Sequence, residues 1–119
     1  MNKKNIFIAT VFLVFFAVGA IFADGRQLAD SASNMANWSG SMKRQALGMN
    51  RKEDAPRVLE TGQRVLEEFQ KLNQRFQHFN SDGKTMTQQE LDRFKSGMRT
   101  MQFNHNDILN HHGRLLRMQ

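Results

Sequence analysis

Eight methionines and four histidines are the side chains of this 119-residue sequence best suited to binding a metal or a haem. Met101 and His105 are four residues apart, so a helix would place both on one face, with Met49 on a parallel neighbouring helix. Thioether and imidazole together suit Cu(I) and also form the axial pair of some haems. Since core packing explains the same residues, we predict no cofactor. Haem b or copper at Met101, His105 and Met49 is the alternative.

A classical metal site is not expected from the histidines. His105 and His112 fall on the predicted buried stripe of one helix, about 10.5 Å apart along its axis, whereas metal–ligand bonds measure only about 2 Å. His111 is expected to point away from this stripe and to pair with Asp107 at the surface. The sequence contains no cysteine, which excludes thiolate metal sites and cysteine nucleophiles.

Catalysis and nucleic-acid binding are not expected either. No nucleophile elbow, glycine-rich phosphate loop or paired-carboxylate cleft can be identified, and the serines between positions 31 and 41 follow no strand. The net charge is +6, but the densest basic stretch, residues 43–57, is interrupted by Glu53 and Asp54. A nucleic-acid binder would concentrate its positive charge on one face. We predict a protein that is not an enzyme and has no nucleic-acid partner.

Residues 6–23 are uncharged and almost wholly apolar, and Lys3 and Lys4 precede them. As a helix this run would be about 27 Å long, close to the hydrocarbon thickness of a bilayer. The preceding lysines favour an amino terminus inside the cytoplasm. We predict that residues 1–23 form a signal peptide or a retained signal-anchor helix, with residues 24–119 outside the cytoplasm. The expected location is the periplasmic side of a bacterial inner membrane, or the soluble periplasm if the leader is cleaved.

The remaining sequence has a helical hydrophobic period. Between 55 and 79, apolar or small positions recur at steps of three and four: Gly62, Val65, Phe69, Leu72, Phe76 and Phe79. Asp54 is the expected N-cap of this helix, and Pro56 lies in its first turn, where it is tolerated.

Two further helices are predicted on either side of this one. Thr87 and Glu90 form a capping box, which opens a helix that reaches Leu115, with loosening near Asn104 or an end before Gly113. Another helix spans about 26–48, with a break at 24–25 if it continues from the leader. No strand-like alternation is present. The predicted fold is all-α, an up-down-up three-helix bundle after the leader, with self-association as one way to add a fourth helix.

Two short stretches resemble known families. LADSASNMANWSGSMK resembles the first helix of soluble four-helix b-type cytochromes. That likeness implies a haem with Met35 as one ligand and His105 or His112 as the other, although three helices would leave the first and last parallel and these residues far apart. The stretch from Met86 to Glu90 resembles the L-T-x-x-Q signature of periplasmic stress chaperones of the Spy and CpxP kind, which implies a stress chaperone or sensor.

The function predicted from these observations is that of a non-catalytic, membrane-anchored accessory subunit or interaction partner of an envelope complex. The apolar stripes extend beyond what three helices can cover, which favours a protein partner. Trp38, Met42 and Met49 are the candidate partner surface, with ordinary core packing as their alternative. The haem or copper bundle and the stress chaperone remain the competing hypotheses.

Overall fold

The computed structural model describes the backbone of residues 17–119 and the side chains from Asp24 onward. It contains three long helices, α2 (Ala17–Leu47), α3 (Ala55–Ser81) and α4 (Gln88–Leu116), and a short 3₁₀ turn, η1 (Lys52–Asp54). Within this described part there is no strand, so the predicted all-helical bundle is confirmed. Most of the predicted leader, residues 1–23, lies outside the described residues. Among those described, no helix combines the length and apolarity needed to cross a membrane.

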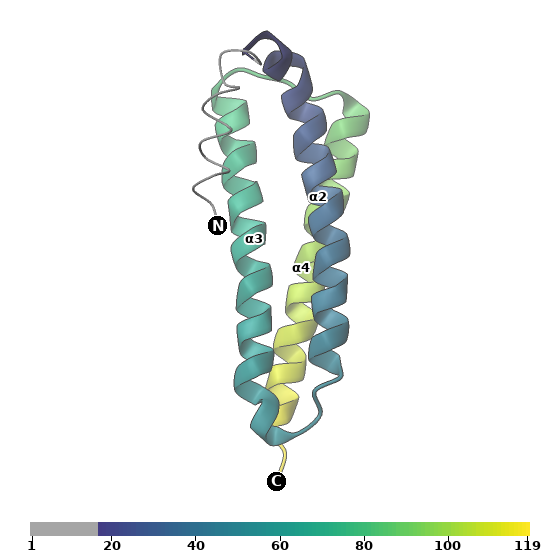
Figure 1. Ribbon diagram of the computed structural model, residues 1–119, viewed down its shortest axis with the longest axis vertical. Coiled ribbons are helices and arrows are strands. Elements are labelled where there is room, and N and C mark those ends of the chain that lie inside the picture. Colours follow the sequence, from purple (N-terminus) through teal and green to yellow (C-terminus); the bar gives the residue numbers. More distant parts are fainter. Residues whose placement is uncertain (1–16) are drawn as a thin grey trace.

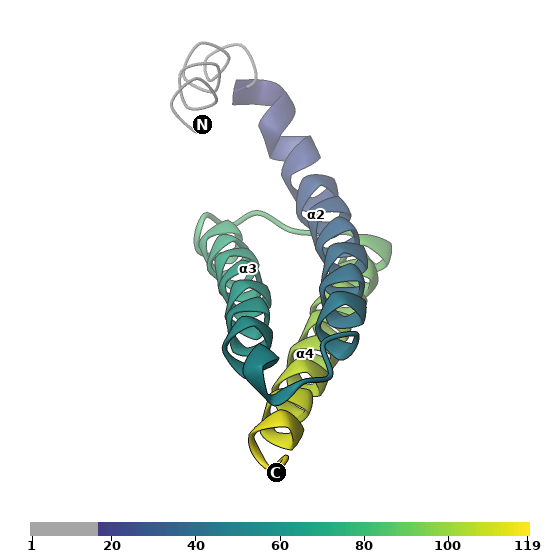
Figure 2. The ribbon, with the colours of Figure 1, turned by 60° about the horizontal axis from the view of Figure 1, so that its bottom comes forward.

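The three helices run up, down and up around a shared core (Figure 1). Helices α2 and α4 are parallel and lie side by side over most of their length, whereas α3 runs antiparallel to both (Figures 1 and 2). The end of the bundle where α2 enters therefore also carries the turn from α3 to α4. The opposite end carries η1 and the carboxyl terminus.

Helix α3 agrees closely with its prediction, since it begins at Ala55, with Pro56 in the first turn, and ends two residues late at Ser81. Gly83 follows with φ of 75°, a left-handed conformation that glycine adopts without steric cost. Asp54 occupies the predicted N-cap position, but its side chain does not cap α3. Its carboxylate accepts a hydrogen bond from the Arg51 amide at 3.2 Å and caps the preceding turn, so it makes no side-chain bond to α3.

Helix α4 begins with the predicted capping box. The Glu90 amide donates to Thr87 Oγ1 at 3.1 Å, and the Thr87 amide donates to Glu90 Oε1 at 2.9 Å. The helix neither loosens at Asn104 nor ends before Gly113, because Asn104 is buried and hydrogen-bonded to α2. Helix α2 likewise passes positions 24 and 25 without the predicted break.

Small residues allow α2 and α4 to approach closely. Gly97 packs on the Ala32 backbone so tightly that an added β-carbon would lie 2.6 Å from the Ala32 carbonyl oxygen. One heptad further on, Asn104 Nδ2 donates to Ser39 Oγ at 2.8 Å. Both pairs are 65 residues apart in the chain. This constant offset with a seven-residue repeat is the packing expected of two parallel helices. We call this contact the α2–α4 seam.

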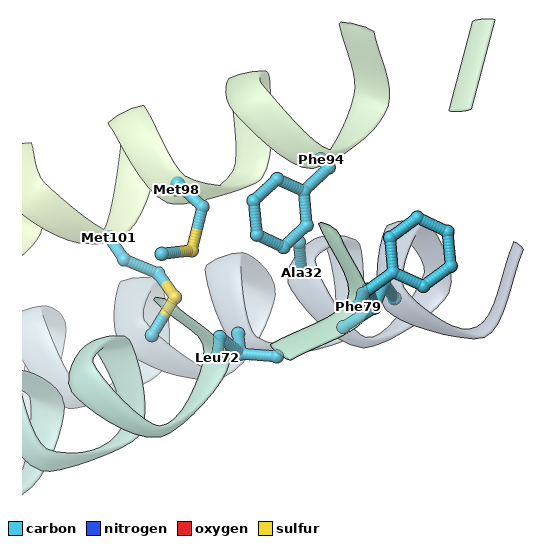
Figure 3. Packing of buried hydrophobic residues seen from close by; sticks show 7 residues of the cluster. Ala32, Leu72, Phe79, Phe94, Met98 and Met101 are labelled. Atoms are coloured by element: carbon cyan, nitrogen blue, oxygen red, sulfur yellow. The ribbon is translucent and has the colours of Figure 1, made fainter. Parts of the chain in front are cut away.

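The core consists of two clusters stacked along the bundle. The upper cluster, at the end where α2 enters, is shown in Figure 3 and contains Leu28, Ala32, Leu72, Phe79, Phe94, Met98 and Met101. The lower cluster contains Met42, Ala46, Ala55, Val58, Val65, Ile108 and Leu115. Leu72 and Phe79, two large side chains of α3, share the upper cluster with Ala32 of the seam (Figure 3). Helix α3 therefore lies further from α2 than α4 does (Figures 1 and 2).

Candidate functional site

The three residues predicted as a cofactor site do not come together. Met101 is fully buried in the upper cluster, beside Met98 (Figure 3). Met49 packs half-buried against the lower cluster, and its carbonyl oxygen lies 2.7 Å from Nε2 of His111. Ten residues of α4 separate Met101 from His111, which is about 15 Å along the helix axis. His105, four residues after Met101, is half-buried.

His111 is buried, whereas His105 and His112 are only half-buried, so the prediction that His105 and His112 are the buried histidines is wrong. Nδ1 of His111 lies 3.1 Å from Arg114 Nη2, while Nε2 faces the Met49 carbonyl. Since a guanidinium only donates and a carbonyl only accepts, a neutral ring with its proton on Nε2 satisfies both. Asp107, the expected partner of His111, instead pairs with Lys43 at 2.7 Å. Both nitrogens of His111 are thus occupied.

The predicted partner surface is only partly at the surface. Met42 is 8% exposed and belongs to the lower cluster, while Trp38 and Met49 are half-buried against that cluster. Trp38 and Met49 therefore remain accessible at their edges, and Met42 is a core residue of this chain. Within the described range there is also no group of three or more His, Asp or Glu side chains that could hold a metal ion.

A groove lies between α3 and α4, and we call it the aromatic groove because three phenylalanines line it. Its volume is about 270 Å³, and its lining residues are Phe69, Asn73, Phe76, Phe94, Lys95, Met98, Arg99 and Gln102. Phe76 and Phe94 stack at its base with ring centroids 4.5 Å apart. Phe69 and Phe76 remain half-buried, so their outer edges face solvent. Two cations, Lys95 and Arg99, stand at the rim.

The apolar strip continues beyond this groove toward the other end of the bundle. Leu109 contacts α3 at Gly62, where an added β-carbon would lie 3.3 Å from its Cδ2 atom. Steps of four and three residues place His105 on the same face of α4, between Gln102 and Leu109. Partial burial lowers the pKa of His105 below its ordinary value, because desolvation disfavours the charged ring. Leu66 of α3, one turn from Gly62, is also half-buried.

A second groove, between α2 and α3, opens at the end where α2 enters, and we call it the cationic groove. It has a volume of about 550 Å³, and the residues that line it are Asp24, Gln27, Leu28, Lys71, Gln74, Arg75, His78, Phe79, Asp82 and Lys84. Each of its two acidic residues has a basic neighbour: Lys84 forms an ion pair with Asp24, and Nε2 of His78 lies 3.6 Å from Asp82 Oδ2. The hydrogen bond to Asp24 raises the pKa of Lys84.

The chain matches no protein-family model, no curated protein and no solved structure. Sequence reasoning missed the α2–α4 seam and both grooves. One signal for the seam was present in the sequence, because small residues recur every seven positions on α2: Gly25, Ala32, Ser39 and Ala46.

Proposed function

We propose that this chain is a non-catalytic accessory protein of a bacterial envelope complex, held at the periplasmic face of the inner membrane by residues 6–23. Its bundle binds one helix of a protein partner along the aromatic groove. The observation that carries this proposal is the groove itself, where Phe69 and Phe76 leave apolar surface uncovered beside the core. The uncharged, lipid-length run behind Lys3 and Lys4 supports the anchor.

The shape of the groove favours a helix as its occupant. Two antiparallel helices form its walls, and a fourth helix laid between them would complete a four-helix bundle. An amphipathic helix would insert apolar side chains at i, i+3, i+4 and i+7 over Phe69, Phe76 and Met98. The strip through His105 and Leu109 extends the contact along the bundle. Partner binding would then cover apolar edges that three helices leave in water.

The charge at the rim indicates which helix would fit. Neither Lys95 nor Arg99 has a carboxylate within ion-pair distance among the described residues. Acidic residues along the flanks of the incoming helix would complement these cations, steer the encounter and fix its direction. The proposal therefore specifies an amphipathic partner helix with acidic flanks.

Co-purification of the full-length chain from gently solubilised membranes tests the proposal. Phe69→Ser and Lys95→Glu should each reduce recovery of the partner about tenfold or more, as expected for central contacts of an interface. Phe103→Ser is the matched control, since Phe103 is 63% exposed on α4 and does not line the groove. This control should retain the partner, and circular dichroism should show that all three variants are folded.

Three results would contradict the proposal. A wild-type chain that is always recovered alone and monomeric has no stable partner. A chain recovered only as a homodimer would assign the groove to a second copy. Equal loss of the partner in Phe103→Ser and Phe69→Ser would place the interface elsewhere on α4.

A further inference from the structure

We infer that the end of the bundle farthest from the predicted leader binds an acidic segment of a protein, with an apolar side chain of that segment placed against Leu116. We call this surface the basic end and define it as residues 43–57 and 114–118. It is a different surface from the aromatic groove, so the inference goes beyond the proposed function. Only the exclusion of membrane lipid rests on the proposed anchor.

The fold brings two basic segments together at this end. Residues 43–57 join α2 to α3 and lie beside the carboxyl-terminal turn of α4 (Figure 1), where Leu115 shares the lower cluster with Ala46 and Ala55. The basic end contains seven Lys or Arg and two acidic residues, a net charge of +5. The rest of residues 24–119 contains eight Lys or Arg and nine acidic residues, a net charge of −1. The positive excess of the bundle therefore lies at this one end.

Most of these cations have no acidic partner within the bundle. Lys43 pairs with Asp107 at 2.7 Å, and Arg51 lies 4.0 Å from Asp54. Among the described residues, the other five have no carboxylate within ion-pair distance: Arg44, Lys52, Arg57, Arg114 and Arg117. Charges gathered on one side of a protein attract an oppositely charged partner and orient it on approach. The basic end is therefore complementary to an acidic surface.

Exposed apolar side chains lie among these cations. Leu116 is 54% exposed and Met118 is 41% exposed, and the third strongly exposed large apolar side chain of the described part is Phe103. Arginines on either side of Leu116, at positions 114 and 117, complete the surface. Arginine and methionine are enriched in protein–protein interfaces, which join an apolar centre to a polar rim. A bare polyanion offers no apolar group to Leu116, whereas an acidic protein segment can. This combination favours a protein as the occupant.

The position of the basic end excludes lipid of the anchoring membrane. Because α2 passes positions 24 and 25 without a break, Lys43 lies about 30 Å beyond residue 23 along the helix axis. Each polar layer of a bilayer is about 5–8 Å thick, and the Debye length at physiological ionic strength is about 8 Å. A helix tilt of about 20° shortens the 30 Å by less than about a tenth. The basic end of an anchored chain therefore stands well beyond the lipid head groups.

The test of the charge contribution measures binding of a fluorescent peptide of repeated Glu-Glu-Leu units to the full-length chain in a neutral detergent. Lys52→Glu combined with Arg117→Glu should weaken binding about tenfold or more, because like charges would then face each other. Arg26→Glu combined with Arg64→Glu makes the same change in net charge at exposed positions outside the basic end, and binding should stay within about twofold of wild type. Raising the salt from about 10 mM to about 100 mM shortens the Debye length from about 30 Å to about 10 Å and should weaken binding to the wild-type chain.

The apolar contribution is tested with the same peptide. Leu116→Ser should weaken binding about fivefold, as expected if part of this side chain is buried in the complex. Phe103→Ser is the control, since Phe103 is equally a strongly exposed side chain of α4 but lies outside the basic end, and it should bind the peptide as wild type does. Circular dichroism should show that every variant keeps the helical content of the wild-type chain.

Three results would overturn the inference. Equal losses in the two double variants would show that total charge, and not this surface, attracts the peptide. No measurable binding of the peptide to the wild-type chain at the lower salt concentration would remove the site altogether. An oligothymidine strand that binds at least as tightly as the peptide, without a response to Leu116→Ser, would assign the surface to a nucleic acid or another bare polyanion.

The outcome is separable from that of the proposed function. Phe69→Ser, which lies in the aromatic groove, should leave binding of the acidic peptide unchanged. Failure of the basic end to bind the peptide would therefore leave the aromatic groove and the anchor standing. Loss of the partner helix from the aromatic groove would likewise leave the basic end in place.

Discussion

Replacing Gly97 by alanine is expected to destabilise the protein, although alanine is the better helix former. In the α2–α4 seam the new β-carbon would lie 2.6 Å from the Ala32 carbonyl oxygen, 2.7 Å from its carbon and 2.9 Å from Ala32 Cβ. Two of these atoms belong to backbone, so no rotamer change can relieve the contact. The two helices must move apart and loosen the seam between them.

The size of the effect follows from two opposing terms. Overpacking of a close contact typically costs about 1–3 kcal/mol, and because rigid backbone opposes the added atom we expect the upper half of that range. Replacing glycine by alanine within a helix contributes about 1 kcal/mol in the other direction. The net loss for Gly97→Ala is therefore about 1–2 kcal/mol, and each kcal/mol lowers Tm by about 4–8 °C in a domain of this size.

Gly113→Ala is the matched control on the same helix. Its added β-carbon would meet only the end of the flexible Arg117 side chain, at 3.4 Å, which is an ordinary contact. We expect this variant to gain about 0.4–1 kcal/mol. In thermal unfolding followed by circular dichroism at 222 nm, Gly97→Ala should therefore lower Tm and Gly113→Ala should raise it. If Gly97→Ala raises Tm as much as Gly113→Ala does, the close approach of α2 to α4 at Ala32 is wrong.

Three further outcomes are expected. Ser39→Ala should lower the free energy of unfolding in urea by about 1–3 kcal/mol, because it leaves the buried Asn104 amide without its acceptor. Adding Asn104→Leu should recover part of that loss. A double variant as unstable as the sum of both single changes would contradict this pairing. Thr87→Ala should lower the free energy of unfolding by about 1 kcal/mol through loss of the α4 cap. Asp54→Ala should lower it less, because the Asp54 carboxylate caps only η1. Equal losses in the two variants would show that the Asp54 carboxylate stabilises the protein as much as the Thr87 cap does. The folded-state pKa of His105 is lowered from 6.5, so the unfolded chain binds more protons just below that pH and stability should fall as pH drops through this region. His105→Gln should lessen the change in Tm between pH 7.5 and 5.5, and an unchanged pH dependence would refute the contribution.

The helices themselves could be predicted from the sequence because their signals are local. The apolar steps of three and four give α3 to within two residues of its end, and Thr87 with Glu90 gives the start of α4. Each signal depends on residues within one or two turns of the same segment.

The positions that α4 buries around its histidines could not be predicted in the same way. Near positions 104–105 and 111–112 the steps of three and four leave a choice between neighbouring residues, and we chose His105 and His112 over Asn104 and His111. The structure buries the other pair because each finds a hydrogen-bond partner more than sixty residues away, at Ser39 and Met49. Such partners cannot be seen in a local window, yet they offset the cost of burying a polar group.

The two grooves depend on the unequal distances between the helices. Small residues at Ala32 and Gly97 bring α2 and α4 together, while Leu72 and Phe79 hold α3 further out. Sequence periodicity reports which face of a helix is apolar. It does not report how closely two particular helices approach, which depends on the side chains of both at their point of contact.

The parallel pairing of α2 with α4 also means that part of the α2 surface must wait for the end of the chain before it is covered. The contacts that define the α2–α4 seam join residues 65 positions apart, which is entropically costly until α3 and α4 have formed their local hairpin. Helix α2 can pack on α3 as soon as α3 is made, since residues of both helices share the two core clusters, but the side of α2 that forms the seam stays uncovered until α4 has emerged. A nascent chain stalled before position 97 would lack the α4 residue that packs on Ala32 of α2.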